Sequence, residues 1–189
     1  MAVVSVTPQQ YVLCAYDPAR IAELVDRAAT LVGFGRDEPI VVDVDETTPL
    51  LRVNVVSTDP VTLHVEGGAF EDPRVPRHLG EQTVLANVGG PLFRAWDMRQ
   101  PAFAEAPGEA KLTLGQRAAW DVYTVGRCAR VGLPAQRQRR LYSFRNRHGF
   151  TDATDRVFDR LWLSDGLTWA DILAACNETV PSNTNGSAA

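Results

Sequence analysis

Apolar residues change their spacing along the first third of the chain, from every third or fourth position to every second. The first pattern begins after Asp17-Pro18, where an acid that can cap a helix precedes a proline suited to the first turn. Apolar residues then recur at helical spacing, at Ile21, Leu24, Val25, Ala28, Leu31 and Val32. Gly33 follows this run as a helix terminator. The pattern predicts a helix over residues 18–32.

Three later runs alternate apolar and polar residues, which is the period of a strand with one buried face. Their apolar positions are Ile40, Val42 and Val44, then Leu51, Val53 and Val55, then Val61, Leu63 and Val65. Such alternation is typical of antiparallel sheets, and the short segment 57–60 suits a hairpin turn between the second and third runs. Segments 2–6 and 11–15 are candidates for one or two further strands. The pattern predicts an antiparallel sheet packed on the single helix 18–32.

The second half of the chain has helical periodicity alone. Residues 80–97 are predicted to be helical in part, with an interruption at Gly89-Gly90-Pro91. Further helices are predicted to start at a capping box at Thr113, at Pro134, near Thr151 and at Thr168. The predicted fold class is α+β, with an N-terminal sheet domain followed by an all-helical C-terminal half.

The change of pattern also predicts a division into domains. We expect an α+β domain over residues 1–99 and a helical domain over residues 113–180. Residues 100–112 contain Pro101 and Pro107-Gly108 and are predicted as the linker between them. Residues 181–189 are polar and small, which predicts a disordered tail.

Composition is that of a globular protein, with 45% hydrophobic and 22% charged residues. No run is apolar and long enough to span a membrane, and no signal-peptide pattern is present at the N-terminus. The three cysteines, Cys14, Cys128 and Cys176, lie far apart without a Cys-x-x-Cys pair, which argues against a disulfide framework and a cysteine zinc site. We therefore expect a cytoplasmic protein. Lys111 is the only lysine among the 19 basic residues, which suggests a high-GC, bacterial coding bias.

Charge is distributed unevenly along a chain whose net charge is −4. Residues 1–112 carry 16 acidic and 9 basic residues, whereas residues 113–150 carry eight arginines against Asp121 alone. Five of these arginines lie in the segment RQRRLYSFRNRHGF, residues 137–150. Such asymmetry indicates either an anionic partner or an electrostatic contact inside the protein.

A helical projection of residues 134–148 separates two sides. Leu141, Phe144 and His148 form a narrow apolar stripe. Candidate nucleic-acid contacts are the residues opposite the stripe and the arginines that flank it, which are Arg139, Tyr142, Ser143 and Asn146, and Arg140, Arg145 and Arg147. Three interpretations remain open. The helix could dock on the acidic N-terminal half, contact nucleic acid or another phosphate, or bind a protein partner.

The segment ARVGLPAQRQRRLYSFRNRHGF, residues 129–150, resembles the turn and second helix of a helix-turn-helix in AraC-type regulators. The following residues, HGFTDATDRVFDRLW and GLT, are similar to the Gly-Phe-Ser-Asp segment of the second helix-turn-helix in that family. The resemblance covers about 40 residues. It implies a DNA-binding protein whose recognition helix is 134–148.

The polar side of the predicted sheet offers a different candidate site. His64 and Glu66 lie two residues apart on one strand and point the same way, as do Asp43 and Asp45 on another. These side chains are possible ligands of a divalent metal, and His64 is a candidate general base oriented by Glu66. The alternative is a solvated face on which Arg52 bridges the aspartates across strands.

A loop with adjacent glycines follows this strand. Gly67 and Gly68 allow a close backbone approach, and Glu71, Asp72 and His78 are candidate partners of Glu66. The alternative is a turn-rich connection whose Phe70 fills the core.

Taken together, the patterns favour a non-catalytic binding or regulatory protein without a cofactor, with DNA or another anionic molecule as its partner. One alternative is a metal-assisted enzyme that uses Asp43, Asp45, His64 and Glu66. The other is a structural subunit whose basic helix docks on another protein. A homo-oligomer is a further possible state of the chain.

Overall fold

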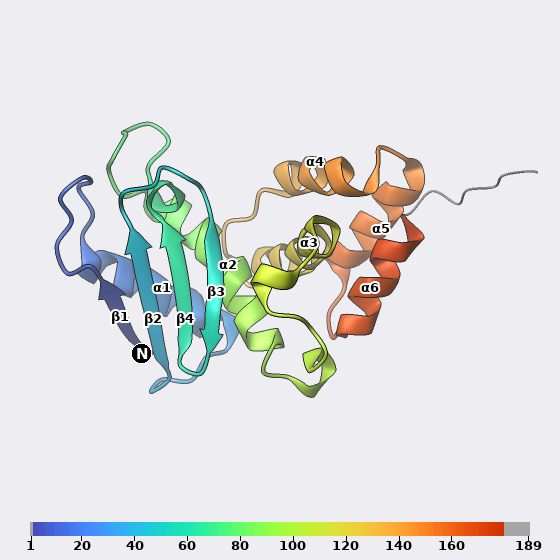
Figure 1. Cartoon of the computed structure of the whole chain (residues 1–189), viewed down its shortest axis with the longest axis horizontal. Helices are drawn as coiled ribbons and strands as arrows, with labels where there is room; N and C mark the ends of the chain where they lie inside the picture. Colours follow the sequence, from blue (N-terminus) through green and yellow to red (C-terminus); the bar gives the residue numbers. More distant parts are fainter. Residues whose placement is uncertain (1, 180–189) are drawn as a thin grey trace, which may run out of the picture.

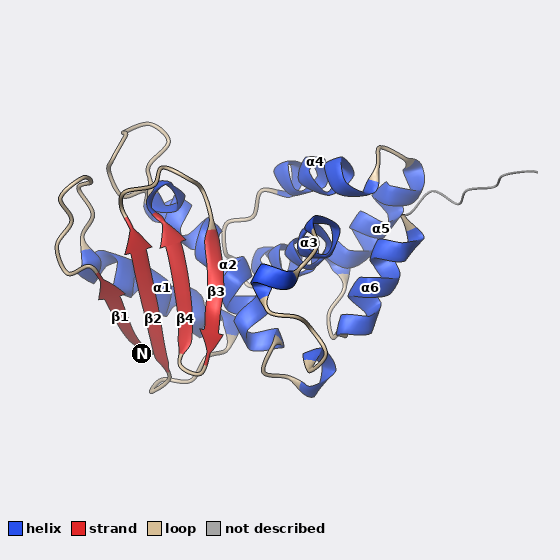
Figure 2. Ribbon diagram, viewed as in Figure 1, coloured by secondary structure: helices blue, strands red, loops and turns tan. Residues whose placement is uncertain are grey.

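The computed structural model describes residues 2–179 and has the predicted α+β fold, with a four-stranded sheet in the N-terminal half (Figures 1 and 2). The strands are β1 (Val3–Thr7), β2 (Pro39–Asp45), β3 (Val53–Thr58) and β4 (Val61–Glu66). The helices are α1 (Pro18–Val32), α2 (Glu81–Asp97), α3 (Leu114–Arg130), α4 (Arg137–His148), α5 (Asp152–Leu163) and α6 (Trp169–Glu178). Three short 3-10 helices, η1 (Gly67–Phe70), η2 (Pro101–Phe103) and η3 (Glu109–Lys111), lie in the connections. The predicted tail 181–189 lies outside the described residues.

The sheet is mixed, so the prediction of an antiparallel sheet is wrong in part. The strand order is β1-β2-β4-β3, with parallel pairs β1–β2 and β2–β4 and one antiparallel pair, β3–β4. The helix α1 connects β1 to β2, and a crossover of this kind returns the chain in the same direction. The predicted hairpin between β3 and β4 is confirmed, as is a strand at residues 2–6. The segment 11–15 forms only an isolated bridge from Ala15 to His78.

Two helices cover one face of the sheet, where a single helix was predicted. Figure 1 shows α1 and α2 behind the strands, with α1 against β1 and α2 against β3. The alternating residues of the strands point their apolar side chains into this layer, and their polar side chains cover the opposite face. One-sided coverage explains the alternation, because a parallel strand that is buried on one face alternates in the same way as an antiparallel one.

The helix α2 is continuous through Gly89-Gly90-Pro91, so the predicted interruption is wrong. Gly89 lies against α3, where an added Cβ atom would be 2.8 Å from the Sγ atom of Cys128. Most of α2 is buried between the sheet and α3. Tertiary packing of this extent outweighs the low helix propensity of glycine and proline.

The helical half is built around α3, which packs against α2, α4, α5 and α6. Its capping box is present, with Thr113 and Gln116 exchanging hydrogen bonds. Trp120 on α3 is fully buried and stacks on Phe103, with 5.2 Å between ring centroids. Phe103 belongs to the predicted linker 100–112, where Glu109 is also buried, so this segment packs closely against the helical core.

Among residues 2–179, no helix combines the length and the apolar character needed to cross a membrane.

Candidate functional site

The side of α4 predicted to be free is exposed to solvent. Phe144 and His148 are buried against the other helices, as the apolar stripe predicted. The exposed residues include five of the predicted nucleic-acid contacts, which are Arg139, Tyr142, Ser143, Asn146 and Arg147. The outward face of α4, defined by these five residues, is therefore available to a partner.

His148 anchors α4 from the buried side. Its Nε2 atom lies 3.0 Å from the carbonyl oxygen of Gly115, and its Nδ1 atom lies 2.7 Å from the hydroxyl oxygen of Thr179. Because a carbonyl oxygen can only accept, Nε2 is the donor to Gly115, while the Thr179 hydroxyl itself donates a hydrogen bond of 2.7 Å to the carbonyl oxygen of Cys176. Burial lowers the pKa of His148 below its ordinary value of 6.5, which favours the neutral imidazole over the charged one.

The remaining two predicted contacts, Arg140 and Arg145, turn toward neighbouring helices. Arg145 makes two hydrogen bonds to the carboxylate of Asp155 on α5, of 2.8 and 2.5 Å, and these bonds lower the pKa of Asp155. The Nη1 atom of Arg140 lies 3.6 Å from the Oδ2 atom of Asp121 on α3. Arg137 pairs with Asp159 on α5. These partners all belong to the helical half, so these ion pairs of α4 give no support to docking on the acidic N-terminal half.

Two arginines on the outward face keep their charge free of carboxylates. Within the described part of the chain, neither Arg139 nor Arg147 forms an ion pair. An exposed aromatic pair lies on the same side of the helical half: Tyr142 and Phe150 are 62% and 63% exposed, with 6.1 Å between ring centroids. The helical projection places Tyr142 on this side, but it does not extend to Phe150, which comes directly after the glycine that ends α4.

The connection between α3 and α4 differs from that of a helix-turn-helix. It runs from Val131 to Gln136, whereas such motifs use a turn of about three or four residues. Leu133 in this connection is buried in the core of the sheet half. The connection therefore attaches α4 to both halves of the protein.

The four candidate metal ligands lie on the polar face of the sheet, where each has a different partner. The Nδ1 atom of His64 lies 3.0 Å from the Oδ2 atom of Asp43 on the neighbouring strand. Asp45 instead accepts hydrogen bonds from Thr47, which lower its pKa. Arg52 approaches Glu66 at 3.8 Å and does not bridge the aspartates. Within residues 2–179, no group of three or more His, Cys, Asp or Glu side chains is placed to hold a metal ion.

The adjacent glycines of the loop serve chain packing. An added Cβ atom on Gly68 would lie 2.1 Å from the carbonyl oxygen of Pro49, so only glycine allows the two segments to meet here. Phe70 is fully buried, which agrees with the interpretation of a connection that fills the core. Glu71 and Asp72 accept hydrogen bonds from backbone amides of their own loop, and His78 contacts the carbonyl oxygen of Pro76.

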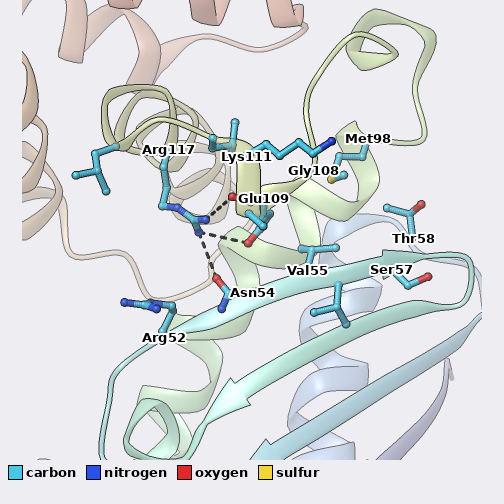
Figure 3. Close-up of a pocket in the computed structure, with 14 residues that line it drawn as sticks. Arg52, Asn54, Val55, Ser57, Thr58, Met98, Gly108, Glu109, Lys111 and Arg117 are labelled. Atoms are coloured by element: carbon cyan, nitrogen blue, oxygen red, sulfur yellow. Dashed lines mark hydrogen bonds and ion pairs between the residues drawn. The ribbon is translucent and has the colours of Figure 1, made fainter.

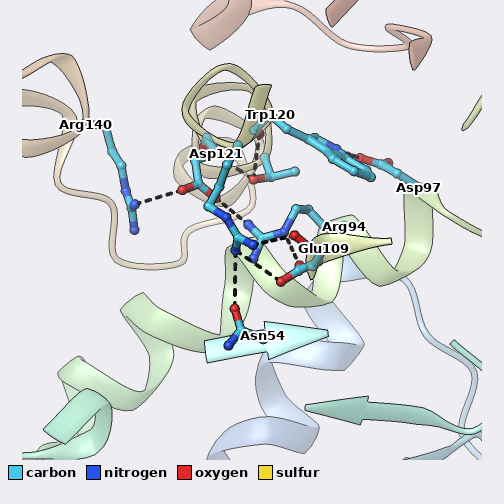
Figure 4. A network of polar contacts seen from close by, with 9 residues as sticks. Asn54, Arg94, Asp97, Glu109, Trp120, Asp121 and Arg140 are labelled. Carbon is cyan, nitrogen blue, oxygen red and sulfur yellow. Dashed lines mark hydrogen bonds and ion pairs between the residues drawn. The ribbon is translucent and has the colours of Figure 1, made fainter. Parts of the chain in front are cut away.

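A buried ion network joins the sheet half to the helical half (Figure 4). Arg94 of α2, with 4% of its side chain exposed, donates a hydrogen bond of 2.6 Å from Nε to Glu109 and another from Nη1 to Asp121. Burial acts to lower the pKa of Arg94, but the carboxylates of Glu109 and Asp121 outweigh it and the pKa is raised. Arg117 of α3 also contacts Glu109 and reaches Asn54 of β3 at 3.3 Å. No periodicity in the sequence indicated these pairings.

A second part of the junction is centred on Asp97 of α2. It accepts hydrogen bonds from Arg127 and from the ring nitrogen of Trp120, at 2.5 and 3.0 Å. Burial nevertheless raises the pKa of Asp97. The guanidinium of Arg127 also lies over the ring of Phe93, 4.1 Å from its centroid. The junction is thus held by hydrogen-bonded and ion-paired polar groups as well as by apolar packing.

Two cavities adjoin this junction. The larger, of about 1010 Å³, lies between β3 and residues 108–117 (Figure 3). The smaller, of about 130 Å³, is lined by Arg52, Arg94, Arg117 and Arg140 among other residues. Arg52 and Arg117 line both cavities.

Comparison with known proteins assigns neither a family nor a function to this chain. No family model matches this chain, and neither a curated protein nor a solved structure matches it. The resemblance of residues 129–168 to AraC-type regulators therefore stays a resemblance, and a function has to be argued from the geometry of this chain alone.

Proposed function

We propose that this chain is a non-catalytic binding protein whose outward face of α4 contacts nucleic acid. The supporting observation is a combination of side chains on this face. Arg139 and Arg147 have no carboxylate partner among residues 2–179, and the rings of Tyr142 and Phe150 are exposed beside them. Arginine binds phosphate oxygens, and exposed aromatic rings stack on unpaired bases. Ser143 and Asn146 add side chains that can hydrogen-bond to phosphates or base edges.

The acidic character of the whole chain is compatible with this proposal because of where the acids lie. The two α5 aspartates that contact α4 are already paired, Asp155 with Arg145 and Asp159 with Arg137. The acidic residues of the sheet half lie away from the outward face, since α4 packs on α3 and α5 (Figure 1). A polyanion on α4 would then meet arginines before it meets free carboxylates.

The test is fluorescence anisotropy with labelled duplex and labelled single-stranded DNA at about 50 mM salt, where phosphate contacts are strongest. The double variant Arg139→Ala/Arg147→Ala should weaken binding and make the slope of log K against log salt shallower by about two units. Tyr142→Ala should cost about 1–3 kcal/mol for single strands, where bases can stack, and less for duplex.

Arg36→Ala is the control, because Arg36 is exposed in the loop between α1 and β2 and its loss removes one positive charge, as each of the Arg139 and Arg147 substitutions does. It should leave the affinity nearly unchanged. Absence of binding to both DNAs at micromolar protein would refute the proposal, and so would an equal loss in the control variant.

A further inference from the structure

The two cavities at the junction adjoin each other, because Arg52 and Arg117 line both. The guanidinium groups of the smaller cavity come from four separate parts of the chain. Arg52 directly precedes β3, Arg94 lies on α2, Arg117 on α3 and Arg140 on α4. Residues distant in the sequence are thus brought together around a space of about 130 Å³.

Two of these four guanidinium groups retain unused hydrogen-bond donors. Arg94 and Arg117 are bonded to Glu109. Arg52, by contrast, has its nearest carboxylate, Glu66, at 3.8 Å, and Arg140 has Asp121 at 3.6 Å. Both distances exceed a hydrogen bond, so within the described residues the fork-shaped donor sets of Arg52 and Arg140 are available to a ligand.

The charge and size of the smaller cavity select an oxyanion. Asp121 is the only carboxylate among the described residues that line it, against four arginines, and Asp121 is already bonded to Arg94. Arginine matches the geometry of phosphate oxygens with parallel N–H donors. Pockets for whole drug-sized molecules measure about 300–1,000 Å³, so a cavity of 130 Å³ holds a headgroup and leaves the rest of a ligand outside it.

The larger cavity has exposed apolar side chains that could contact the rest of the ligand. Val56 of β3 and Leu114 of α3 are among the exposed large hydrophobic residues of the protein, and both line it. Figure 3 shows Lys111 and Arg117 on one wall and Arg52 and Asn54 on the opposite wall. Exposed apolar side chains gathered in a hollow with polar walls are typical of ligand sites.

We infer that the junction binds a phosphate monoester with an apolar body. The phosphate lies in the smaller cavity between Arg52 and Arg140, and the body extends along β3 against Val56 and Leu114. A monoester carries close to two negative charges, which the two available guanidinium groups match, whereas a carboxylate carries one. Neither Arg139 nor Arg147 lines either cavity, so this inference is independent of nucleic-acid binding by α4.

The experiment is isothermal titration calorimetry of the full chain with 1-naphthyl phosphate as the probe. Naphthyl phosphate should bind at least 10-fold more tightly than inorganic phosphate, 1-naphthoate or 1-naphthol, because each of these lacks the apolar body or the dianion. Arg52→Gln and Arg140→Gln should each weaken binding about 10-fold or more, since each removes charge-assisted hydrogen bonds. Leu114→Ser should weaken naphthyl phosphate binding and leave inorganic phosphate unaffected.

Arg139→Gln is the matched control, because it makes the same change of charge on the same helix. Its affinity for naphthyl phosphate should stay within about twofold of the wild type. Thermal unfolding of each variant establishes that it is folded, and Arg52→Gln should pass this check because the Arg52 side chain is largely exposed. Failure of naphthyl phosphate to saturate the folded protein at 1 mM, on the order of the weakest specific affinities, would overturn the inference.

The same variants separate the two proposals. Arg52→Gln should spare DNA binding, and Arg139→Gln should weaken it while sparing naphthyl phosphate. If Arg52→Gln instead weakened DNA binding as strongly as naphthyl phosphate binding, the junction would belong to the nucleic-acid surface and the monoester inference would be overturned.

Discussion

Substitution of Arg94 by methionine tests whether the buried ion network holds the two halves together. The side chain of Arg94 is 4% exposed and that of Glu109 is 3% exposed, so neither charge can be hydrated where it lies. Methionine has a similar length and no charge. The variant leaves Glu109 buried with only Arg117, whose Nη1 atom is 3.4 Å away. Asp121, which is more exposed, keeps its contact with Arg140.

The expected loss is large because one partner of a buried pair is removed and the other charge stays behind. Breaking such a pair costs about 3–5 kcal/mol of unfolding free energy. For a protein of this size, 1 kcal/mol corresponds to about 2–4 °C in Tm, so Tm should fall by about 6–20 °C. The denaturant m-value should stay constant, since the surface exposed on unfolding is the same.

The assay is urea and thermal unfolding, monitored by circular dichroism, and Arg94→Met is compared with two other variants. Arg160→Met is the matched control: Arg160 and Glu178 make two hydrogen bonds, but their side chains are 51% and 46% exposed, so the loss should be about 0–1 kcal/mol. The double variant Arg94→Met/Glu109→Leu removes both buried charges and should recover at least half of the loss.

A fall of less than about 1 kcal/mol for Arg94→Met, equal to that of the exposed control, would refute this reasoning. So would a double variant less stable than Arg94→Met, because the loss could not then come from a stranded carboxylate.

Two further predictions concern packing and pH. Gly89→Ala should lower stability by about 1–3 kcal/mol, because its Cβ atom would lie 2.8 Å from the Sγ atom of Cys128. Gly90→Ala should raise stability by up to about 1 kcal/mol, because its nearest contact is at an ordinary 3.5 Å and alanine favours the helix. Urea unfolding of both variants checks that the two changes have opposite signs. Because burial lowers the pKa of His148 in the folded state, the unfolded chain binds the proton more readily, and stability should fall as pH drops below about 6.5. His148→Asn should flatten this dependence between pH 7.5 and 5.5, and an unchanged slope would contradict the assignment.

The strands and helices could be predicted from local patterns, but their arrangement could not. The alternation in residues 40–44 and 61–65 identifies one buried face in each strand, and both became strands. Whether these strands run parallel depends on the path of the chain between them. Here α1 returns the chain from β1 to β2, and β3 occupies the edge beside β4, which leaves β2 and β4 parallel neighbours. Alternation carries no information about that path.

For the candidate site on α4, the sequence could predict which side chains face the core and which face solvent. The projection placed Phe144 and His148 inside and Tyr142 and Asn146 outside, and the structure agrees. It could not identify which arginines would find partners. Arg145 meets Asp155 ten residues later, and this pairing depends on how α5 packs against α4.

Counting charges by segment could not predict that Arg94 would be buried in an ion network. Net charge by segment suggested a basic helix docked on an acidic half, yet the buried contacts at the junction run mainly from α2 and α3 to Asp97, Glu109 and Asp121. The cost of a buried charge depends on its immediate neighbours far more than on the sum over a segment, because screening and water weaken distant pairs. The most buried arginine at the junction is Arg94, which lies inside the predicted sheet domain. It belongs to α2, the helix in which a glycine-proline interruption was expected. Its importance follows from the continuity of α2 through that interruption, since only an unbroken helix places Arg94 opposite both Glu109 and Asp121.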